Sequence, residues 1–339
     1  MSGRFQKSIT KVEAWQGDGT MRNDAIFLEP FFQKRIWGGQ RLRQLFDYQI
    51  PSTKTGEAWT ISAHPTGPSV VKNGQWKGKT LQQLWQESPE LFGKNSPSGC
   101  FPLLVKLIDA NDDLSVQVHP DDFDAREQSG ESNGKTECWY VVHAEPNSEI
   151  VLGHHAKSKV EFSEMVENGA WEQLLRKVKV KQGDFFYVPS GTLHAIGNGI
   201  VILEIQQNSD ITYRVYDYDR KDANGKARPL HLDEAMKVTQ VPHMETTQEV
   251  ISQQKEALQL KRFIEGEYFT VEHWNVMGTV DLTMEKSYLL CSVIAGEGKL
   301  VMENTYYLRK KDHFILPAGI TNYRLIGEME LVVASEGKG

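Results

Sequence analysis

Short runs of β-branched and aromatic residues dominate this chain, and Gly, Pro, Asn and Asp separate one run from the next. Runs spaced in this way are typical of strands in an all-β sandwich or barrel, rather than of a doubly wound α/β sheet. We therefore predict a mainly β fold. Its expected strands include AIFLEP (25–30), GEAWTISA (56–63), LLVKLI (103–108), LSVQVH (114–119), ECWYVVHA (137–144), SEIVLG (148–153), DFFYVP (184–189), IVILEIQ (200–206) and ITYRVYDY (211–218).

Helical periodicity is confined to a small part of the chain. An apolar stripe follows residues 158–178 and is interrupted near Gly169, which predicts a small helical segment in two pieces. TLQQLWQES (80–88) predicts another helix, and the polar, weakly patterned stretch at 240–258 indicates a domain boundary. The predicted units are an N-terminal extension at 1–20, a first domain at 21–245 that contains the helical insertion, and a second domain at 246–339.

The chain repeats itself across the predicted boundary. Residues 181–196 resemble residues 310–325. The matched pairs are Asp184 with Asp312, Phe186 with Phe314, Pro189 with Pro317, and Gly191 with Gly319. We therefore expect two domains of one kind. In this alignment His194 falls opposite Asn322, so a function that depends on His194 would be confined to the first domain.

Composition argues against several classes of protein. Three widely spaced cysteines without a CxxC pair indicate neither a disulfide framework nor a thiolate zinc site. A formal net charge of −7 argues against a nucleic-acid partner, because phosphate backbones require basic surfaces. No stretch approaches the roughly 18 apolar residues of a spanning helix, and the first twenty residues lack the apolar core of a signal peptide. We expect a cytoplasmic protein with no membrane partner.

The stretch LSVQVHPDD (114–122) places Gln117 and His119 on one face of a strand, because side chains alternate across a strand. Such a polar stripe commonly faces solvent. However, GDFFYVPSGTLH (183–194) resembles the second motif of the cupin superfamily, in which a turn carries a metal-binding His at the mouth of a barrel. The resemblance implies that Gln117, His119, Glu137 and His194 meet at one metal inside the barrel. This ligand set suits Zn²⁺, and the sequence does not separate Zn²⁺ from Fe²⁺, Mn²⁺ or Co²⁺.

A closer resemblance covers residues 29–220. The segments that carry it are EPFFQKRIWGGQRL (29–42), GEAWTISAHP (56–65), LLVKLIDANDDLSVQVHPDD (103–122), GKTECWYVV (134–142), PSGTLHAI (189–196) and QNSDITYRVYDYDR (207–220). Together they resemble the type I mannose-6-phosphate isomerase family, specifically its short bacterial form. The resemblance implies two cupin-type jelly-roll β-barrels, one Zn²⁺ per subunit, and interconversion of mannose 6-phosphate and fructose 6-phosphate through a cis-enediol.

The resemblance also implies a base and an anion-binding group for this reaction. Lys135 projects to the same side as Glu137, two residues on, and a nearby metal cation should lower its pKa toward that of a usable base. Arg214 would hold developing negative charge with its planar fork of donors. The competing interpretations are a solvated Lys135 and an Arg214 that forms an ion pair with Asp217 or Asp219.

Three further residues are expected to contact the substrate. Asp210 would assist ring opening, although its place after Asn208-Ser209 also suits an ordinary turn residue. Lys106 and Ser115 are candidates for phosphate binding. Because Lys106 interrupts an apolar strand, we expect a ligand or a carboxylate to pair with its ammonium.

Two other functions fit parts of this pattern. A 2-His-1-carboxylate cupin could bind Fe²⁺ and act as a dioxygenase, and a cupin without catalytic activity could bind a sugar phosphate. Gln117 as a fourth ligand and the basic residues suited to an anionic polyol favour the isomerase. The expected partner is a small sugar phosphate, and the chain is expected to be a monomer or a homodimer.

Overall fold

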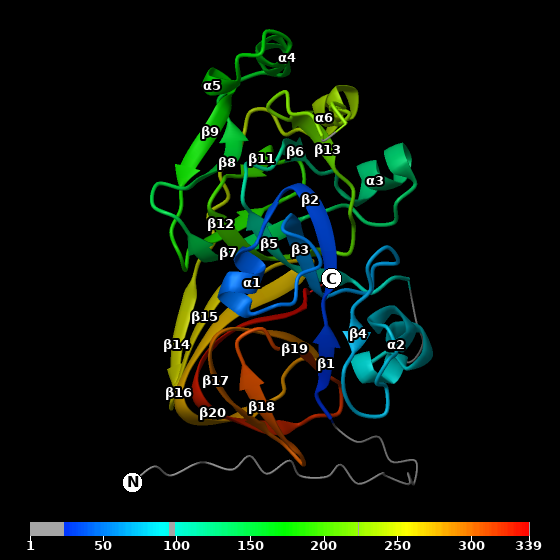
Figure 1. Cartoon of the computed structure of the whole chain (residues 1–339), viewed down its shortest axis with the longest axis vertical. Coiled ribbons are helices and arrows are strands. Elements are labelled where there is room, and N and C mark those ends of the chain that lie inside the picture. Colours follow the sequence, from blue (N-terminus) through cyan, green and yellow to red (C-terminus); the bar gives the residue numbers. More distant parts are fainter. Residues whose placement is uncertain (1–23, 95–98, 223, 339) are drawn as a thin grey trace.

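The computed structural model describes residues 24–94, 99–222 and 224–338, and its strands form three sheets (Figure 1). In sheet order, the six-stranded sheet contains β10 (Phe185–Val188), β7 (Glu137–Ala144), β12 (Ile200–Gln207), β5 (Leu103–Ala110), β3 (Thr55–Ile61) and β2 (Phe31–Gly39). The five-stranded sheet contains β13 (Tyr213–Tyr216), β6 (Val116–Val118), β11 (His194–Ile196), β8 (Glu149–His154) and β9 (Leu175–Lys179).

The nine-stranded sheet joins both ends of the described chain. Its strands are β14 (Ile251–Lys255), β15 (Leu258–Glu265), β16 (Phe269–Thr283), β20 (Asn322–Glu336), β17 (Leu289–Val301), β19 (His313–Leu316), β1 (Ile26–Glu29) and β4 (Val70–Val71), with β18 (Thr305–Arg309) paired to β17. Because β1 pairs with β19, the first strand of the chain completes a sheet made mostly of its last hundred residues. The sheets are therefore not divided where the domain boundary is predicted.

Each half of the molecule encloses an apolar interior. In the upper half of Figure 1 the six- and five-stranded sheets face each other across a core that includes Trp139, Ile196 and Ile202. In the lower half the nine-stranded sheet curls around a second core that includes Trp274 and Leu325. A third cluster packs between the two halves. Burial of these apolar side chains is the main stabilising contribution.

The helices are short and lie outside the sheets. They are α1 (Arg41–Phe46), α2 (Leu81–Glu87), the 3₁₀ helix η1 (Pro89–Phe92), α3 (Asp122–Ser129), α4 (Lys159–Glu167), α5 (Trp171–Leu174) and α6 (Leu232–Val238). Thr80 and Gln83 form a reciprocal capping box that starts α2, which confirms the helix predicted at 80–88. None of the helices in the described ranges has the length and apolarity needed to cross a bilayer.

The prediction for residues 158–178 is wrong at its C-terminal end. The break near Gly169 is confirmed, because α4 ends at Glu167 and α5 begins at Trp171. Residues from Leu175 onward form β9 instead of helix and pair with β8. Val178 there alternates with charged neighbours, as in a strand at the edge of a sheet, and this local alternation outweighs the helical spacing upstream.

All nine predicted strand segments contain strands, and the mainly β, cupin jelly-roll fold class is confirmed. The strands form separate facing sheets instead of closed barrels. The two segments of the internal repeat contain similar turns, each closed by a hydrogen bond to an Asp side chain. Asp184 accepts a hydrogen bond from the backbone N–H of Lys181 at 3.0 Å, and Asp312 accepts one from Arg309 at 2.9 Å. The predicted extension at 1–20 lies outside the described residues.

Candidate active site

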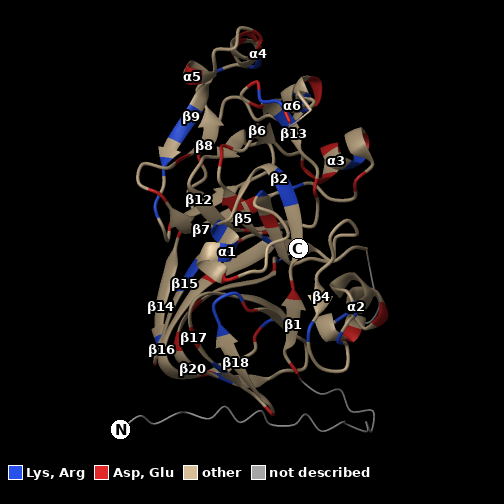
Figure 2. Ribbon diagram, in the orientation of Figure 1, with Lys and Arg blue, Asp and Glu red and all other residues tan. Residues whose placement is uncertain are grey.

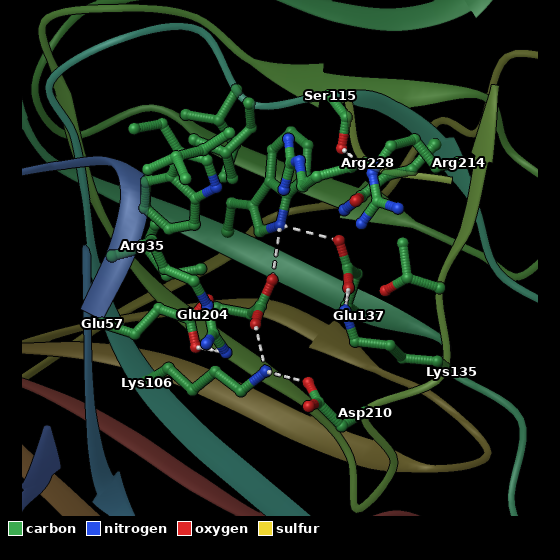
Figure 3. A pocket seen from close by; sticks show the side chains of 18 of the residues that line it. Arg35, Glu57, Lys106, Ser115, Lys135, Glu137, Glu204, Asp210, Arg214 and Arg228 are labelled. Atoms are coloured by element: carbon green, nitrogen blue, oxygen red, sulfur yellow. Dashed lines mark hydrogen bonds and ion pairs between the residues drawn. The ribbon is translucent and has the colours of Figure 1, made fainter. Parts of the chain in front are cut away.

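A cavity of about 500 Å³ opens between the two sheets of the upper half (Figure 3). This volume lies within the roughly 300–1,000 Å³ of typical small-ligand pockets. Its charged lining consists of the cations Lys34, Arg35, Lys106, Lys135, Arg214 and Arg228, and the carboxylates Glu57, Glu137, Glu204 and Asp210. The excess of cations suits an anionic ligand, although charges of both signs are otherwise spread over the molecule (Figure 2).

Strand register places the polar side chains of this cavity in two facing rows. In the five-stranded sheet, Gln117 pairs directly with His194 on one side and with Arg214 on the other. In the six-stranded sheet, Glu204 pairs with Lys106 and with Trp139. Residues directly opposite each other in paired strands share one face of the sheet. Gln117 and Arg214 both line the cavity, so this face is the inner one, as expected for Gln117.

His119, Glu137 and His194 form a buried cluster at the wall of the cavity. One ligand atom from each residue lies within 4.8 Å of the others, and all three side chains are almost fully buried. The amide nitrogen of Gln117 lies 3.4 Å from His194 Nε2. Three of the four residues expected to bind metal thus form one cluster, and the fourth lies beside it.

The protonation of this cluster suits a cation. Burial lowers the pKa of both His side chains, that of His119 to about 3, so both imidazoles are neutral at physiological pH. His194 Nδ1 lies 2.9 Å from the carbonyl oxygen of Thr192, which fixes the tautomer with Nε2 unprotonated. Among the described residues His119 Nδ1 has no hydrogen-bond partner. The other ring nitrogen, Nε2, faces the cluster, 3.4 Å from Glu137 Oε2. Two neutral imidazoles beside one carboxylate form a donor set that fits a bound metal ion.

Lys135 lies beside this cluster, where carboxylates surround its ammonium group. Its Nζ lies 2.7 Å from Glu137 Oε2 and 3.0 Å from His119 Nε2. Burial disfavours the ammonium, yet the carboxylates of Glu137 and Glu204 outweigh burial and raise the pKa of Lys135. The sequence argument considered only a metal cation and left out the paired carboxylates.

Lys106 is 3% exposed and lies between two carboxylates, which confirms the expectation that it is paired. Its Nζ is 3.5 Å from Glu204 Oε2 and 3.6 Å from Asp210 Oδ1 (Figure 3). It also lies 4.9 Å from the ring centre of Trp59. Burial raises the pKa of Glu204 to about 7, with a further contribution from Glu137. A carboxyl group with a pKa near neutrality is suited to general acid–base chemistry.

Arg214 points into the cavity from β13 and is not neutralised by an acidic neighbour within the described ranges. Its Nε donates to Ser115 Oγ at 3.3 Å, and its Nη1 donates to the carbonyl oxygen of Pro229 at 2.9 Å. Asp217, proposed above as its competing partner, instead forms salt bridges with Arg220 and Arg228. Arg214 therefore keeps donors available to a ligand, and Ser115 lies beside it.

The sequence analysis missed several residues that line this cavity. The most informative are Glu204, Arg35, Glu57 and Arg228. Glu204 carried a signal, because a single acid in the apolar run IVILEIQ is the natural partner of the single lysine in LLVKLI. Arg35 and Glu57 form a two-bond ion pair at 2.8 and 3.0 Å, but no local pattern marks either residue.

Comparisons with known proteins agree with this geometry. A family model described as the catalytic domain of phosphomannose isomerase type I matches residues 26–133, and a model of the mannose-6-phosphate isomerase cupin domain matches residues 259–336. The chain is 49% identical over 315 residues to mannose-6-phosphate isomerase ManA of Bacillus subtilis (strain 168), covering 93% of this chain and 99% of that protein. It is 50% identical over 313 residues to a mannose-6-phosphate isomerase of Streptococcus mutans, covering 92% and 98% of the two chains.

Solved structures show the same similarity. A crystal structure of a mannose 6-phosphate isomerase from Bacillus subtilis superposes with a TM-score of 0.90 at 49% identity, covering 92% of this chain and 99% of that chain. A mannose 6-phosphate isomerase bound with zinc and yttrium superposes with a TM-score of 0.75 at 15% identity, covering 92% and 99% of the two chains. At that identity the second similarity concerns the fold alone.

Proposed function

This chain belongs to the type I phosphomannose isomerase family, and we propose that it interconverts mannose 6-phosphate and fructose 6-phosphate. The observation that carries the proposal is the cluster of two neutral histidines and the Glu137 carboxylate in the wall of a cation-lined cavity. The family and the cavity support the same substrate class, because a sugar phosphate combines a polyol with an anionic group.

We propose that Zn²⁺ is the resident metal and that Gln117, His119, Glu137 and His194 hold it, one ion per chain. When bound, the ion would act as a Lewis acid that favours negative charge on a substrate oxygen. The buried, neutral imidazole of His119 and the fixed tautomer of His194 support this ligand set. Catalysis would be confined to the unit formed by residues 21–245, and the second unit at 246–339 would not hold the catalytic metal.

The reaction moves one proton from C2 to C1 and another between the two oxygens. We assign Lys135 as the base that removes the carbon-bound proton. To act as a base Lys135 must lose its own proton, which the Glu137 carboxylate at 2.7 Å opposes. This assignment therefore requires the charge of Glu137 to be engaged by a bound cation. Glu204 is the competing base, since its raised pKa already suits the task.

The remaining polar residues would position the substrate. Arg214 would bind oxygens on which negative charge develops, because its donors face the cavity without a paired carboxylate in the described part of the chain. Lys106 and Ser115 would contact the phosphate, and Asp210, whose side chain is 43% exposed, would exchange a proton during ring opening.

The test is a coupled assay that reports fructose 6-phosphate formed from mannose 6-phosphate, combined with metal analysis. We expect about one equivalent of zinc per chain, loss of activity on chelation, and recovery with added Zn²⁺. His119→Ala should lose the metal, whereas the matched variant His155→Ala, at an exposed histidine, should keep it. Full activity after verified metal removal, or oxygen consumption in place of isomerisation, would overturn the proposal.

A further inference from the structure

Arg35 and Glu57 form a two-bond ion pair in the wall of the catalytic pocket (Figure 3). Arg35 donates from Nε to Glu57 Oε1 at 2.8 Å and from Nη2 to Oε2 at 3.0 Å. The indole of Trp59 donates to the same Oε2 at 2.7 Å. Both oxygens of Glu57 are therefore engaged, and its charge is balanced within these three residues, which we call the Arg–Glu–Trp group.

The lower half of the molecule contains a second Arg–Glu–Trp group. Glu272 accepts hydrogen bonds from Arg262 Nε and from the indole of Trp274, both at 2.8 Å. The Arg and Glu side chains are 27% and 9% exposed in the upper half, and 26% and 12% exposed in the lower half. A group that occurs in both halves stabilises the fold, so its presence alone does not indicate a role in catalysis.

The two groups differ in the residue that faces the Trp from the next strand. Lys106 of β5 pairs with Trp59, whereas Leu331 of β20 pairs with Trp274. In the lower half the Arg thus balances the Glu with an apolar residue at this position, so the group does not depend on a second cation. Lys106 is therefore not required to neutralise Glu57.

The ammonium group of Lys106 has other partners. Its Nζ lies 3.5 Å from Glu204 Oε2 and 3.6 Å from Asp210 Oδ1. Glu57 nevertheless interacts with it. Burial disfavours the Glu57 carboxylate, but Arg35 and then Lys106 hold the pKa of Glu57 below its usual range. If Arg35 were removed, Lys106 would be the cation left to neutralise this buried carboxylate, and an unpaired buried charge is costly.

We propose that Arg35 is a positioning residue of the catalytic pocket. By engaging both oxygens of Glu57, it prevents this carboxylate from capturing Lys106, and it leaves the Lys106 ammonium for the phosphate of the substrate. The role of Lys106 toward phosphate rests on the proposed function, whereas the position of its ammonium group does not. Arg35 thus acts on substrate binding through Lys106.

Steady-state kinetics of Arg35→Met with mannose 6-phosphate test this role. The variant keeps a long side chain and removes the charge, so Glu57 should draw Lys106 away from the phosphate. We expect KM to rise by about tenfold, the effect of losing one charge-assisted hydrogen bond. The change in kcat should be less than about threefold, because a phosphate contact is made equally before and during the reaction.

Two further variants separate positioning from a structural role. Arg35→Met/Glu57→Gln should recover most of the lost affinity, since a neutral amide does not attract Lys106 and still accepts a hydrogen bond from the indole. Arg262→Met is the matched control, and it should lower the unfolding temperature about as much as Arg35→Met while KM stays at the wild-type value. If Arg35→Met does not fold, Arg35→Gln, which also lacks the charge, carries the same expectation.

Crystal structures of the Arg35 variants give a measurement that does not depend on activity. In Arg35→Met, Lys106 Nζ should lie within hydrogen-bonding distance of a Glu57 oxygen. In the double variant it should return to Glu204 and Asp210. The inference is overturned if Lys106 does not move in Arg35→Met, if KM rises equally in Arg262→Met, or if the double variant binds no better than Arg35→Met. A wild-type protein without isomerase activity would refute the proposed function alone, because the movement of Lys106 can still be measured.

Discussion

Replacing Lys106 with Met tests the buried charge cluster of the catalytic pocket. Lys106 and Glu204 each have side chains 4% exposed, with 3.5 Å between the charged atoms. At that distance their attraction is roughly 5 kcal/mol for an effective dielectric constant of about 20, and desolvation of two buried charges offsets most of it. The net contribution of the pair to stability is therefore small, whereas removal of one partner leaves the other charge buried and unpaired.

Lys106→Met leaves Glu204 buried without its cation. Because the pKa of Glu204 is about 7, its carboxyl can take up a proton at pH 8 at a cost of about 1.4 kcal/mol, so the free energy of unfolding should fall by about 1–2 kcal/mol. Asp210 offsets little of this, because it is half exposed and becomes hydrated. The double variant Lys106→Met/Glu204→Gln removes both charges and keeps an acceptor for the Trp139 indole, so its stability should stay within about 0.5 kcal/mol of the wild type.

The pH dependence gives a second signature. The pKa of Glu204 is already raised to about 7, and removal of Lys106 raises it further. The pKa of a Glu carboxyl group is about 4.3 in the unfolded chain. When the folded state raises that pKa, stability falls as the pH rises from about 4.3 through the pKa of the folded state. The loss of unfolding free energy caused by Lys106→Met, relative to the wild type, should therefore be smaller at pH 6 than at pH 8.

Urea denaturation of the zinc-loaded protein, followed by tryptophan fluorescence, measures these quantities. Lys77→Met is the matched control at an exposed lysine and should stay within about 0.5 kcal/mol of the wild type. If Lys106→Met lowers the free energy of unfolding by less than about 1 kcal/mol at pH 8, the pair is not a buried one. A double variant no more stable than Lys106→Met would equally refute the reasoning.

Three further predictions concern single residues. Lys135→Ala should keep its zinc and KM while kcat falls by about 10²–10⁴-fold; retained exchange of the C2 proton with solvent would assign the base to another group. Arg214→Lys keeps the charge but loses the planar fork, so steady-state kinetics should show the loss mainly in kcat, and a rise in KM alone would contradict this role. Burial lowers the pKa of His313 to about 3. As pH falls below about 6.5, this histidine is protonated in the unfolded chain but stays neutral in the folded one, so acid destabilises the fold. His313→Gln should accordingly show a smaller decrease in urea midpoint between pH 6.5 and 4.5, and equal decreases would refute the assignment.

Much of the site could be predicted from the sequence, because its residues lie in short segments with strong local patterns. The alternation in LSVQVH predicts that Gln117 and His119 share one face of a strand, and the cupin resemblance implies that this face points inward. The turn that carries His194 is marked by Asp, Pro and Gly at fixed spacing. The sequence could predict that Lys106 pairs with a carboxylate, but it could not predict which residue supplies that carboxylate. Glu204 lies 98 positions away, and only the register between β5 and β12 brings the two together.

The errors have a common physical cause, which is that tertiary contacts change local preferences. Helical spacing continues past Leu175, but pairing with β8 makes the segment a strand. A cation near Lys135 is expected to lower its pKa, and the sequence could not place the carboxylates around it, which act in the opposite direction. Arg35 and Glu57 have no local signal at all, because their significance depends on the pairing of β2 with β3.

Register is therefore the property on which the chemistry of this pocket depends most directly. Arg214, Gln117 and His194 form one row across β13, β6 and β11, and a slip of one residue in β6 would turn Gln117 away from the cavity. Such a slip would also bury polar side chains among the apolar residues beneath α4 and α6, where Val116 and Val118 now pack. The apolar residues on the outer face thus hold the register that aligns the polar residues on the inner face. Conservative changes at Val116 or Val118 should consequently affect metal affinity as well as stability, although neither side chain faces the cavity.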